Sequence, residues 1–116
     1  MEYSKLLINE KPLQVLPGLA VLIGLNEAIV LQQLHYWLGK SKNELDGHQW
    51  VYNSYEQWQA QDFPFWHVNT IQRLFGGLEK QGIVLSRRME AQGWNQRKWY
   101  TIDYAALDEM ARSNAA

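Results

Sequence analysis

The sequence predicts a single α+β domain that is mainly helical, and three observations predict this class. Apolar residues recur at three- and four-residue spacing between residues 67 and 80, which is the period of a helix with one buried face. The segments 83–85 and 98–102 are strand-like and enclose a polar stretch, which is typical of a hairpin. The 116 residues are 47% hydrophobic, which suffices for one modest core and not for two.

Composition excludes several classes of protein. The chain contains no cysteine, which excludes disulfides, thiolate zinc sites and cysteine nucleophiles and fits a reducing interior. The longest apolar run, residues 13–25, is broken by Gln14, Pro17, Gly18 and Gly24 and is shorter than the roughly 20 residues that span a bilayer. No basic segment precedes this run, so a signal peptide is not expected. We therefore expect a cytoplasmic protein without a membrane partner.

The first forty residues predict two helices. Residues 1–15 predict either a short strand or an ordered arm. Pro17 suits the first turn of a short helix that ends at Gly24. Asn26 is suited to cap a helix over residues 27–39. This helix is apolar over more than one stripe, so it is either the central core helix or shares its extra face with a partner.

Residues 41–81 predict a loop, a strand and a helix-turn-helix. Asp46 and Gly47 mark a turn in the polar segment 41–47, and residues 49–53 have the composition of a short strand. The helix-turn-helix covers residues 54–81. Its first helix starts with a capping box at Ser54 and Gln57 and stops before Pro64.

The second helix of this pair is expected from His67 to Lys80. One face is apolar and predicted to be buried: Val68, Ile71, Leu74, Phe75 and Leu78. The opposite face can bond to base edges and phosphates through His67, Asn69, Thr70, Gln72 and Arg73. Gly76 and Gly77 are expected to allow the close approach of another helix.

A hairpin and a last helix complete the predicted elements. Gly82 suits a left-handed residue after the helix, and the hairpin over residues 83–102 is expected to turn at a tip of residues 90–96. The base of the hairpin is expected to carry two cations on each strand, namely Arg87, Arg88, Arg97 and Lys98. Asp103 is suited to cap a helix over residues 103–112 that packs against the first helices.

This order of elements is that of a winged helix-turn-helix, with a two- to three-stranded antiparallel wing sheet. Such a fold places one helix in the DNA major groove and the wing on the flanking backbone. Residues 66–100 carry six basic and two acidic side chains, a balance of +4, and the remainder carries −5, which together give the net charge of −1. A local basic face attracts phosphate on a near-neutral protein, because salt screens charges beyond about 10 Å.

Six blocks of the sequence resemble a known family. They are LPGLAVLIGLNEAIVLQQLHYWL, WVYNSYEQWQ, FPFW, NTIQR, LEKQGIV and KWYTIDY, and the resemblance covers about residues 16–107. The chain resembles the amino-terminal winged-helix domains of phage and plasmid replication initiators and replisome organisers from bacteria. The resemblance implies binding to double-stranded DNA at a replication origin. It also implies that Asn69, Thr70, Gln72 and Arg73 face DNA and that Arg87, Arg88, Arg97 and Lys98 belong to the wing.

Two features depart from that family pattern. In the family a separate carboxy-terminal part contacts a helicase loader or helicase, and the 116 residues contain no such region. We therefore expect either a truncated domain of a longer protein or a stand-alone small protein. Trp66 stands at the start of the predicted second helix, where a small capping residue such as serine is more usual.

The full set of expected DNA-binding residues is Trp66, His67, Asn69, Thr70, Gln72, Arg73, Arg87, Arg88, Trp94, Arg97 and Lys98. Trp94 is suited to stack on a base or insert into the minor groove, and equally to pack back on the hairpin. His67 is suited to contact a phosphate, or it is an exposed histidine without a role. His35, His48 and His67 lack the spacing of a metal site, and no nucleophile, base and orienting acid combine. We expect neither an enzyme nor a cofactor.

Two alternative functions are compatible with the same predicted fold. The domain is either a protein-interaction module that docks to a replication or phage partner, or a small transcriptional repressor. A repressor needs a homodimer that sets the spacing of its DNA half-sites. The extra apolar face of the helix over residues 27–39 is suited to that dimer contact.

Overall fold

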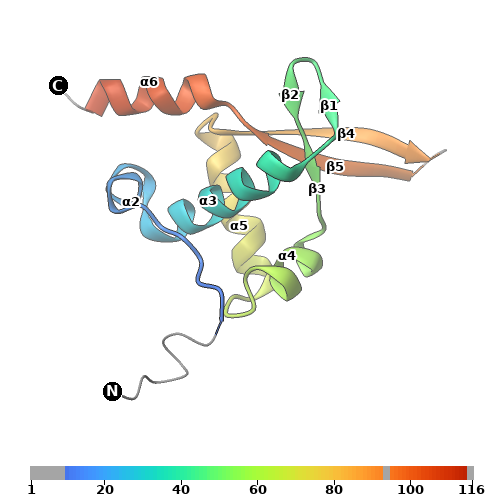
Figure 1. Ribbon diagram of the computed structural model, residues 1–116, viewed down its shortest axis with the longest axis horizontal. Helices are drawn as coiled ribbons and strands as arrows, with labels where there is room; N and C mark the ends of the chain where they lie inside the picture. The colour runs from blue at the N-terminus through green and yellow to red at the C-terminus, as the bar shows by residue number, and fades with distance from the viewer. Residues whose placement is uncertain (1–9, 93–94, 115–116) are drawn as a thin grey trace.

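The computed structural model describes residues 10–92 and 95–114, without the side chains of residues 89–92 and 95–97. The described chain has five helices and two small antiparallel sheets, so the predicted α+β class is confirmed (Figure 1). The helices are α2 (Pro17–Ile23), α3 (Leu25–Lys40), α4 (Tyr55–Gln61), α5 (Val68–Lys80) and α6 (Tyr104–Asn114). The strands are β1 (Glu44–Leu45), β2 (His48–Gln49), β3 (Val51–Tyr52), β4 (Val84–Gln92) and β5 (Asn95–Ile102). Of the expected arm or strand, residues 1–9 lie outside the described residues, and residues 10–15 form neither helix nor strand.

A single residue, Gly24, separates α2 from α3. Pro17 begins α2 as predicted, and the Gly24 backbone N–H donates to the Ala20 carbonyl at 2.8 Å. The expectation that Asn26 caps the next helix is wrong, because α3 already begins at Leu25 and Gly24 occupies its N-cap. Gly24 has φ 106° and ψ 150°, a conformation that residues with a Cβ rarely adopt. The glycine therefore lets two helices meet without a linker.

Replacement of Gly24 by alanine is expected to lower the free energy of unfolding by about 1–3 kcal/mol, because a Cβ strains this backbone conformation. The added Cβ also falls 2.5 Å from Glu27 Oε1, so the Glu27 side chain has to move. Gly18→Ala is the matched control, since nothing lies within 4 Å of a Cβ there; it is expected to leave stability unchanged or raise it by up to about 1 kcal/mol. Urea denaturation measures both values, and equal effects of the two substitutions contradict the prediction.

The start of α4 was predicted correctly, whereas the start of α5 was not. The capping box is confirmed, because the Gln57 backbone N–H donates to Ser54 Oγ at 3.1 Å and the Ser54 N–H donates to Gln57 Oε1 at 2.9 Å. The second helix, α5, begins at Val68, one residue later than expected. His67 is its N-cap, and His67 Nδ1 accepts a hydrogen bond from the Asn69 backbone N–H at 3.1 Å.

The core lies where α5 packs against α3, α4 and the sheet. Most of the predicted buried face of α5 is confirmed, at Ile71, Leu74, Phe75 and Leu78, whereas Val68 is half-buried. The helix α3 buries Ala28, Val30, Leu31, Leu34 and Leu38. The half-buried side chains of Ile29 and Trp37 also pack against this core, so α3 is its central helix.

β5 is the central strand of the larger sheet, which has the order β3–β5–β4 and antiparallel pairing. Tyr52 pairs with Trp99, and Arg87 pairs with Trp99 from the other side. The β4–β5 hairpin is longer than expected, because its strands extend to Gln92 and from Asn95. Hydrogen bonds between backbone groups pair the two strands, so polar side chains do not end the pairing. The expected tip at residues 90–96 is therefore wrong, and the cations lie along the strands.

A small hairpin, β1–β2, replaces the polar loop expected at residues 41–47. Asp46 and Gly47 form its turn, as the sequence predicted, and both have positive φ values, 54° and 79°. The single strand expected at residues 49–53 is split at Trp50, which is only 3% exposed. The Trp50 backbone N–H donates to the Asn43 carbonyl at 2.8 Å, and its Nε1 donates to the Leu45 carbonyl at 3.0 Å. These bonds hold the small hairpin closed beside Trp50.

α6 begins after Asp103, whose Oδ1 accepts a hydrogen bond from the Ala106 backbone N–H at 3.0 Å. The helix runs to Asn114, two residues beyond the expected end. It contributes no buried residue, although Leu107 and Met110 pack against the core. In Figure 1 α6 and the β4–β5 hairpin project from opposite sides of the helical body.

No single helix of the described residues is long and apolar enough to cross a membrane. α2 and α3 reach that length and composition only as a pair, and the pair is bent by 119°.

Candidate nucleic-acid interface

α5 presents one polar face that no other element covers within the described part of the chain. Asn69, Gln72, Arg73 and Lys80 are exposed, and Thr70 is half-buried. Residues 69, 72, 73, 76 and 80 follow the three- and four-residue spacing of one helix face. The structure therefore brings together Asn69, Gln72 and Arg73, three of the four side chains that the sequence assigned to DNA on α5, whereas Thr70 lies to the side of this face.

Gly76 and Gly77 lie in the middle of this face. An added Cβ at either position meets nothing within 4 Å. The expectation that these glycines allow the close approach of another helix of this chain is wrong, because α3 and α4 pack on the apolar side of α5 instead. The result is a stretch of bare helix backbone between Arg73 and Lys80.

The start of α5 is occupied by Trp66 and His67. Trp66 is half-buried, and its ring lies 5.3 Å from the Phe63 ring and 4.8 Å from the Phe65 ring. Its carbonyl accepts a hydrogen bond from Gln59 Nε2 at 2.9 Å. His67 caps α5 through Nδ1 and is otherwise exposed. Both residues therefore have structural contacts at the edge of the polar face of α5.

The strand register divides the cations of the β4–β5 hairpin between two faces of the sheet. Arg88 pairs with Lys98, and Ser86 pairs with Tyr100, so these four share the face that packs on α5. Tyr100 is buried there against Phe75, with ring centroids 4.8 Å apart. Arg87 pairs with Trp99 and lies on the opposite face. Arg88 and Lys98 therefore lie on one face of the sheet and Arg87 lies on the other.

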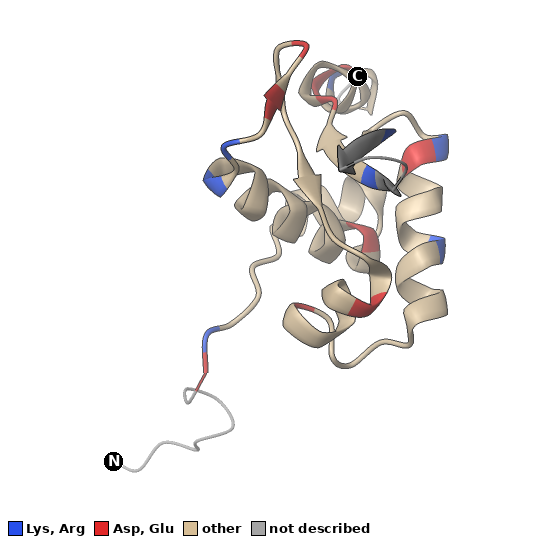
Figure 2. Ribbon diagram, turned by 90° about the vertical axis from the view of Figure 1, so that its right-hand side faces the viewer, with Lys and Arg blue, Asp and Glu red and all other residues tan. Residues whose placement is uncertain are grey.

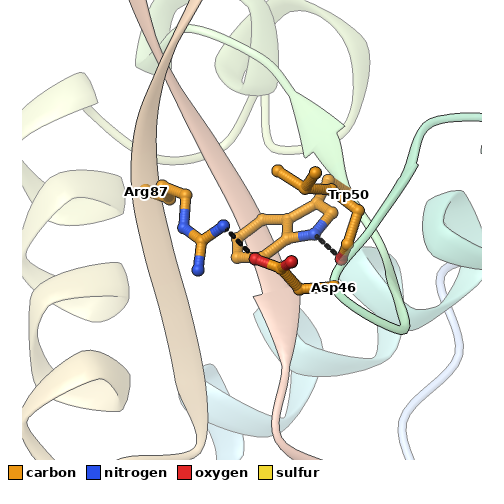
Figure 3. A network of polar contacts seen from close by, with 4 residues as sticks. Asp46, Trp50 and Arg87 are labelled. Atoms are coloured by element: carbon orange, nitrogen blue, oxygen red, sulfur yellow. Dashed lines mark hydrogen bonds and ion pairs between the residues drawn. The ribbon is translucent and has the colours of Figure 1, made fainter.

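Arg87 is held by the β1–β2 hairpin (Figure 3). Its Nη1 donates to Asp46 Oδ2 at 2.5 Å, and its guanidinium lies 5.4 Å from the centroid of the Trp50 ring. Both side chains of the ion pair are largely exposed, so solvent weakens their attraction. The contact turns Arg87 toward Asp46 and away from α5.

Glu79 of α5 joins both strands of the β4–β5 hairpin. Ser86 Oγ donates to Glu79 Oε2 at 3.2 Å, and Lys98 Nζ lies 3.1 Å from Glu79 Oε1. The second contact is an ion pair by distance and lacks hydrogen-bond geometry. Tyr100 donates to the Tyr55 hydroxyl at 3.0 Å behind these groups, and burial raises the pKa of Tyr100 above its ordinary value. These contacts fix the hairpin relative to α5.

Three cations remain available on the α5 side. Arg73, Lys80 and Arg88 form no ion pair with any residue whose side chain is described. Figure 2 shows basic segments of α5 and of the hairpin on one side of the molecule, and those at the end of α3 on the opposite side. Trp94 lies outside the described residues, and of Arg97 only the strand position opposite Met89 is described.

The sequence did not indicate that Asp46 and Glu79 hold hairpin cations. Asp46 was interpreted as a turn residue, and its partner Arg87 lies 41 residues away. Glu79 stood out only as one of two acidic residues in a basic segment. Such pairs depend on the strand register, which the composition does not reveal.

Comparison of this chain with known protein families, curated proteins and solved structures found no match.

Proposed function

We propose that this chain is a winged helix-turn-helix that binds double-stranded DNA. α4 and α5 form the helix-turn-helix, α5 enters the major groove, and the β4–β5 hairpin is the wing on the flanking backbone. The main support is the exposed polar face of α5, on whose side Arg73, Lys80 and Arg88 form no ion pair with a described side chain.

The chemistry of this face supports a groove-binding role. Asparagine and glutamine side chains pair with adenine edges, and arginine pairs with guanine. Asn69, Gln72 and Arg73 supply these groups over the first two turns of α5. The bare backbone at Gly76 and Gly77 lets a DNA strand approach the helix where a larger side chain keeps it away.

The replication role rests on the family resemblance. In this proposal the cytoplasmic domain recognises an origin, and a helicase loader binds elsewhere on a longer protein. A map of binding across origin and promoter fragments tests this role. Enrichment at the origin supports replication, and enrichment at promoters supports a repressor instead.

The affinity for duplex DNA is expected to fall with salt at a logarithmic slope of about −2.7, because three unpaired cations each neutralise one phosphate. A slope of about −4.5 is expected if Arg87 and Lys98 also leave their carboxylates for phosphates. Fluorescence anisotropy over a salt series measures the slope. A value near −4.5 contradicts the assignment of three contacts, and absence of binding at low salt contradicts the proposed function.

One observation favours the second role, a protein-interaction module or a dimer. Apolar side chains are exposed around α2, and Val21 is 89% exposed. The others are Val15, Leu16 and Leu25. α2 itself contains no charged residue. Measuring the solution mass at several concentrations distinguishes a monomer from a homodimer. Val21→Ser is measured beside the wild type, because it removes the most exposed of these apolar side chains.

A further inference from the structure

A second surface lies on the face of the β3–β5–β4 sheet that α5 does not cover. It is an open cleft of about 320 Å³ between the end of α3, the segment after it and the sheet. Four of its residues are aromatic, namely Trp37, Trp50, Tyr52 and Trp99, and Lys40 lies at its edge. We call these five residues the aromatic cleft.

The rings of the aromatic cleft are partly accessible. Trp50 is buried, whereas Trp37, Tyr52 and Trp99 are half-buried. Tyr52 and Trp99 are directly paired across the two strands, and their ring centroids lie 5.7 Å apart. The Trp99 indole nitrogen is buried and has no hydrogen-bond acceptor among the described residues. Accessible indole and phenol faces of this kind stack on nucleobases of any sequence.

Two lysines converge beside the aromatic cleft. Lys11 Nζ donates to Tyr36 Oη at 3.1 Å and lies 4.5 Å from the Tyr36 ring centroid, and Lys40 Nζ lies 5.1 Å from the same centroid. Hydrogen bonding to the two ammonium groups lowers the pKa of Tyr36 below its ordinary value. The Tyr36 and Trp37 rings are 5.2 Å apart, so the lysines lie next to the cleft.

These positive charges have no internal counter-charge in the described structure. Neither Lys11 nor Lys40 forms an ion pair with a described carboxylate, and the neighbouring Glu10 and Glu44 form none with them. Like charges held close together attract an external anion. Lys40 belongs both to this pair and to the aromatic cleft, so an anion here lies beside the stacking rings.

We propose that the aromatic cleft and the Lys11–Lys40 pair bind single-stranded nucleic acid. Its bases stack on the accessible rings, and its phosphates lie beside the two ammonium groups. An acidic peptide uses the cations but not the stacking faces, so the combination favours a nucleic-acid strand. The site is independent of the proposed duplex-binding face, because α5 lies on the other side of the sheet. One domain is thereby able to hold a duplex and an unpaired strand together.

The test is fluorescence anisotropy with a labelled oligo-dT of about 15 nucleotides at about 0.1 M salt, with the whole chain. Each lysine is expected to contribute about 5-fold through counterion release, so Lys11→Ala/Lys40→Ala weakens binding about 25-fold. Arg112→Ala is the control, because it removes one exposed positive charge from α6 and is expected to bind as the wild type does. Both lysines are exposed, so their loss is not expected to unfold the domain.

A second substitution tests stacking. Trp99→Ala is expected to weaken oligo-dT binding by about 5- to 150-fold, and Trp99→Phe restores most of it because a ring remains. Binding of oligo-dT is also expected to quench tryptophan fluorescence. Circular dichroism checks that each variant is folded, and the lysine variant decides the question if Trp99→Ala unfolds.

Several outcomes overturn the proposal. The first is that the wild type does not bind oligo-dT, and the second is that the double lysine variant binds it with wild-type affinity. The third is that poly-glutamate competes for the surface as well as unlabelled oligo-dT does, which assigns the surface to an acidic protein. Arg73→Ala keeps this test separate from the duplex-binding proposal, because it is expected to weaken duplex binding and leave oligo-dT binding unchanged. Oligo-dT binding without any duplex binding rejects the proposed function alone.

Discussion

Arg73→Ala is expected to weaken binding to the preferred duplex by about 5- to 150-fold, the equivalent of about 1–3 kcal/mol for one bidentate arginine–guanine contact. Arg73 is exposed on the polar face of α5 and forms no ion pair with a described side chain, so its replacement breaks no described ion pair. The reduction is expected to be largest on the preferred sequence and smaller on unrelated duplexes. Binding isotherms with both kinds of duplex measure it.

Arg88→Ala is the matched comparison for Arg73→Ala. Arg88 is exposed on the α5 side of the hairpin, where a phosphate contact is expected. Its loss weakens binding to all duplexes by a similar factor and reduces the salt slope by about 0.9. Wild-type affinity of both variants rejects this placement of the interface. If Arg88→Ala changes the duplex affinity in a sequence-dependent way and Arg73→Ala changes it uniformly, the roles assigned to the two residues are reversed.

Phe75→Ala is expected to lower the free energy of unfolding by about 3–5 kcal/mol, because it leaves a large cavity in the core. Phe75 is 0% exposed. Its ring lies 5.6 Å from Trp58, 6.1 Å from Tyr55 and 4.8 Å from Tyr100, so one side chain joins α4, α5 and β5. Urea denaturation followed by circular dichroism measures the loss.

Phe65→Ala controls for the loss of an aromatic ring. Phe65 lies in the turn before α5 and is 58% exposed, so its truncation is expected to cost less than about 1 kcal/mol. If the two substitutions destabilise the protein equally, Phe75 is not the side chain that joins these elements.

The helices were largely predictable because their signals are local. The three- and four-residue spacing on α5 and the capping box at Ser54 and Gln57 each depend on residues within one or two turns. Boundaries were less predictable. The start of α3 was placed too late because Asn26 is a good capping residue, whereas Gly24 adopts a conformation that brings α2 and α3 together without a separate cap.

The candidate site was predictable on α5 and only in part on the hairpin. On a helix, residue spacing alone decides which side chains share a face, so Asn69, Gln72 and Arg73 were grouped correctly. On a hairpin, the register and the neighbouring elements decide. Arg87 and Arg88 are adjacent in sequence, yet one pairs with Asp46 and the other lies on the α5 side. The aromatic cleft was missed because its rings come from α3, β3, β5 and the segment between β2 and β3.

The α+β class, the order of the helices and the polar face of α5 follow from local sequence patterns, because periodicity and capping depend on residues that are close together along the chain. Which of the described cations lack an ion pair, and which rings form the aromatic cleft, depends on how the elements are arranged in space. Asp46 reaches Arg87 across 41 residues, and Tyr52 meets Trp99 only through strand pairing. Ion pairs and clefts depend on distances between chain segments, and those distances are set when the helices pack on the sheet.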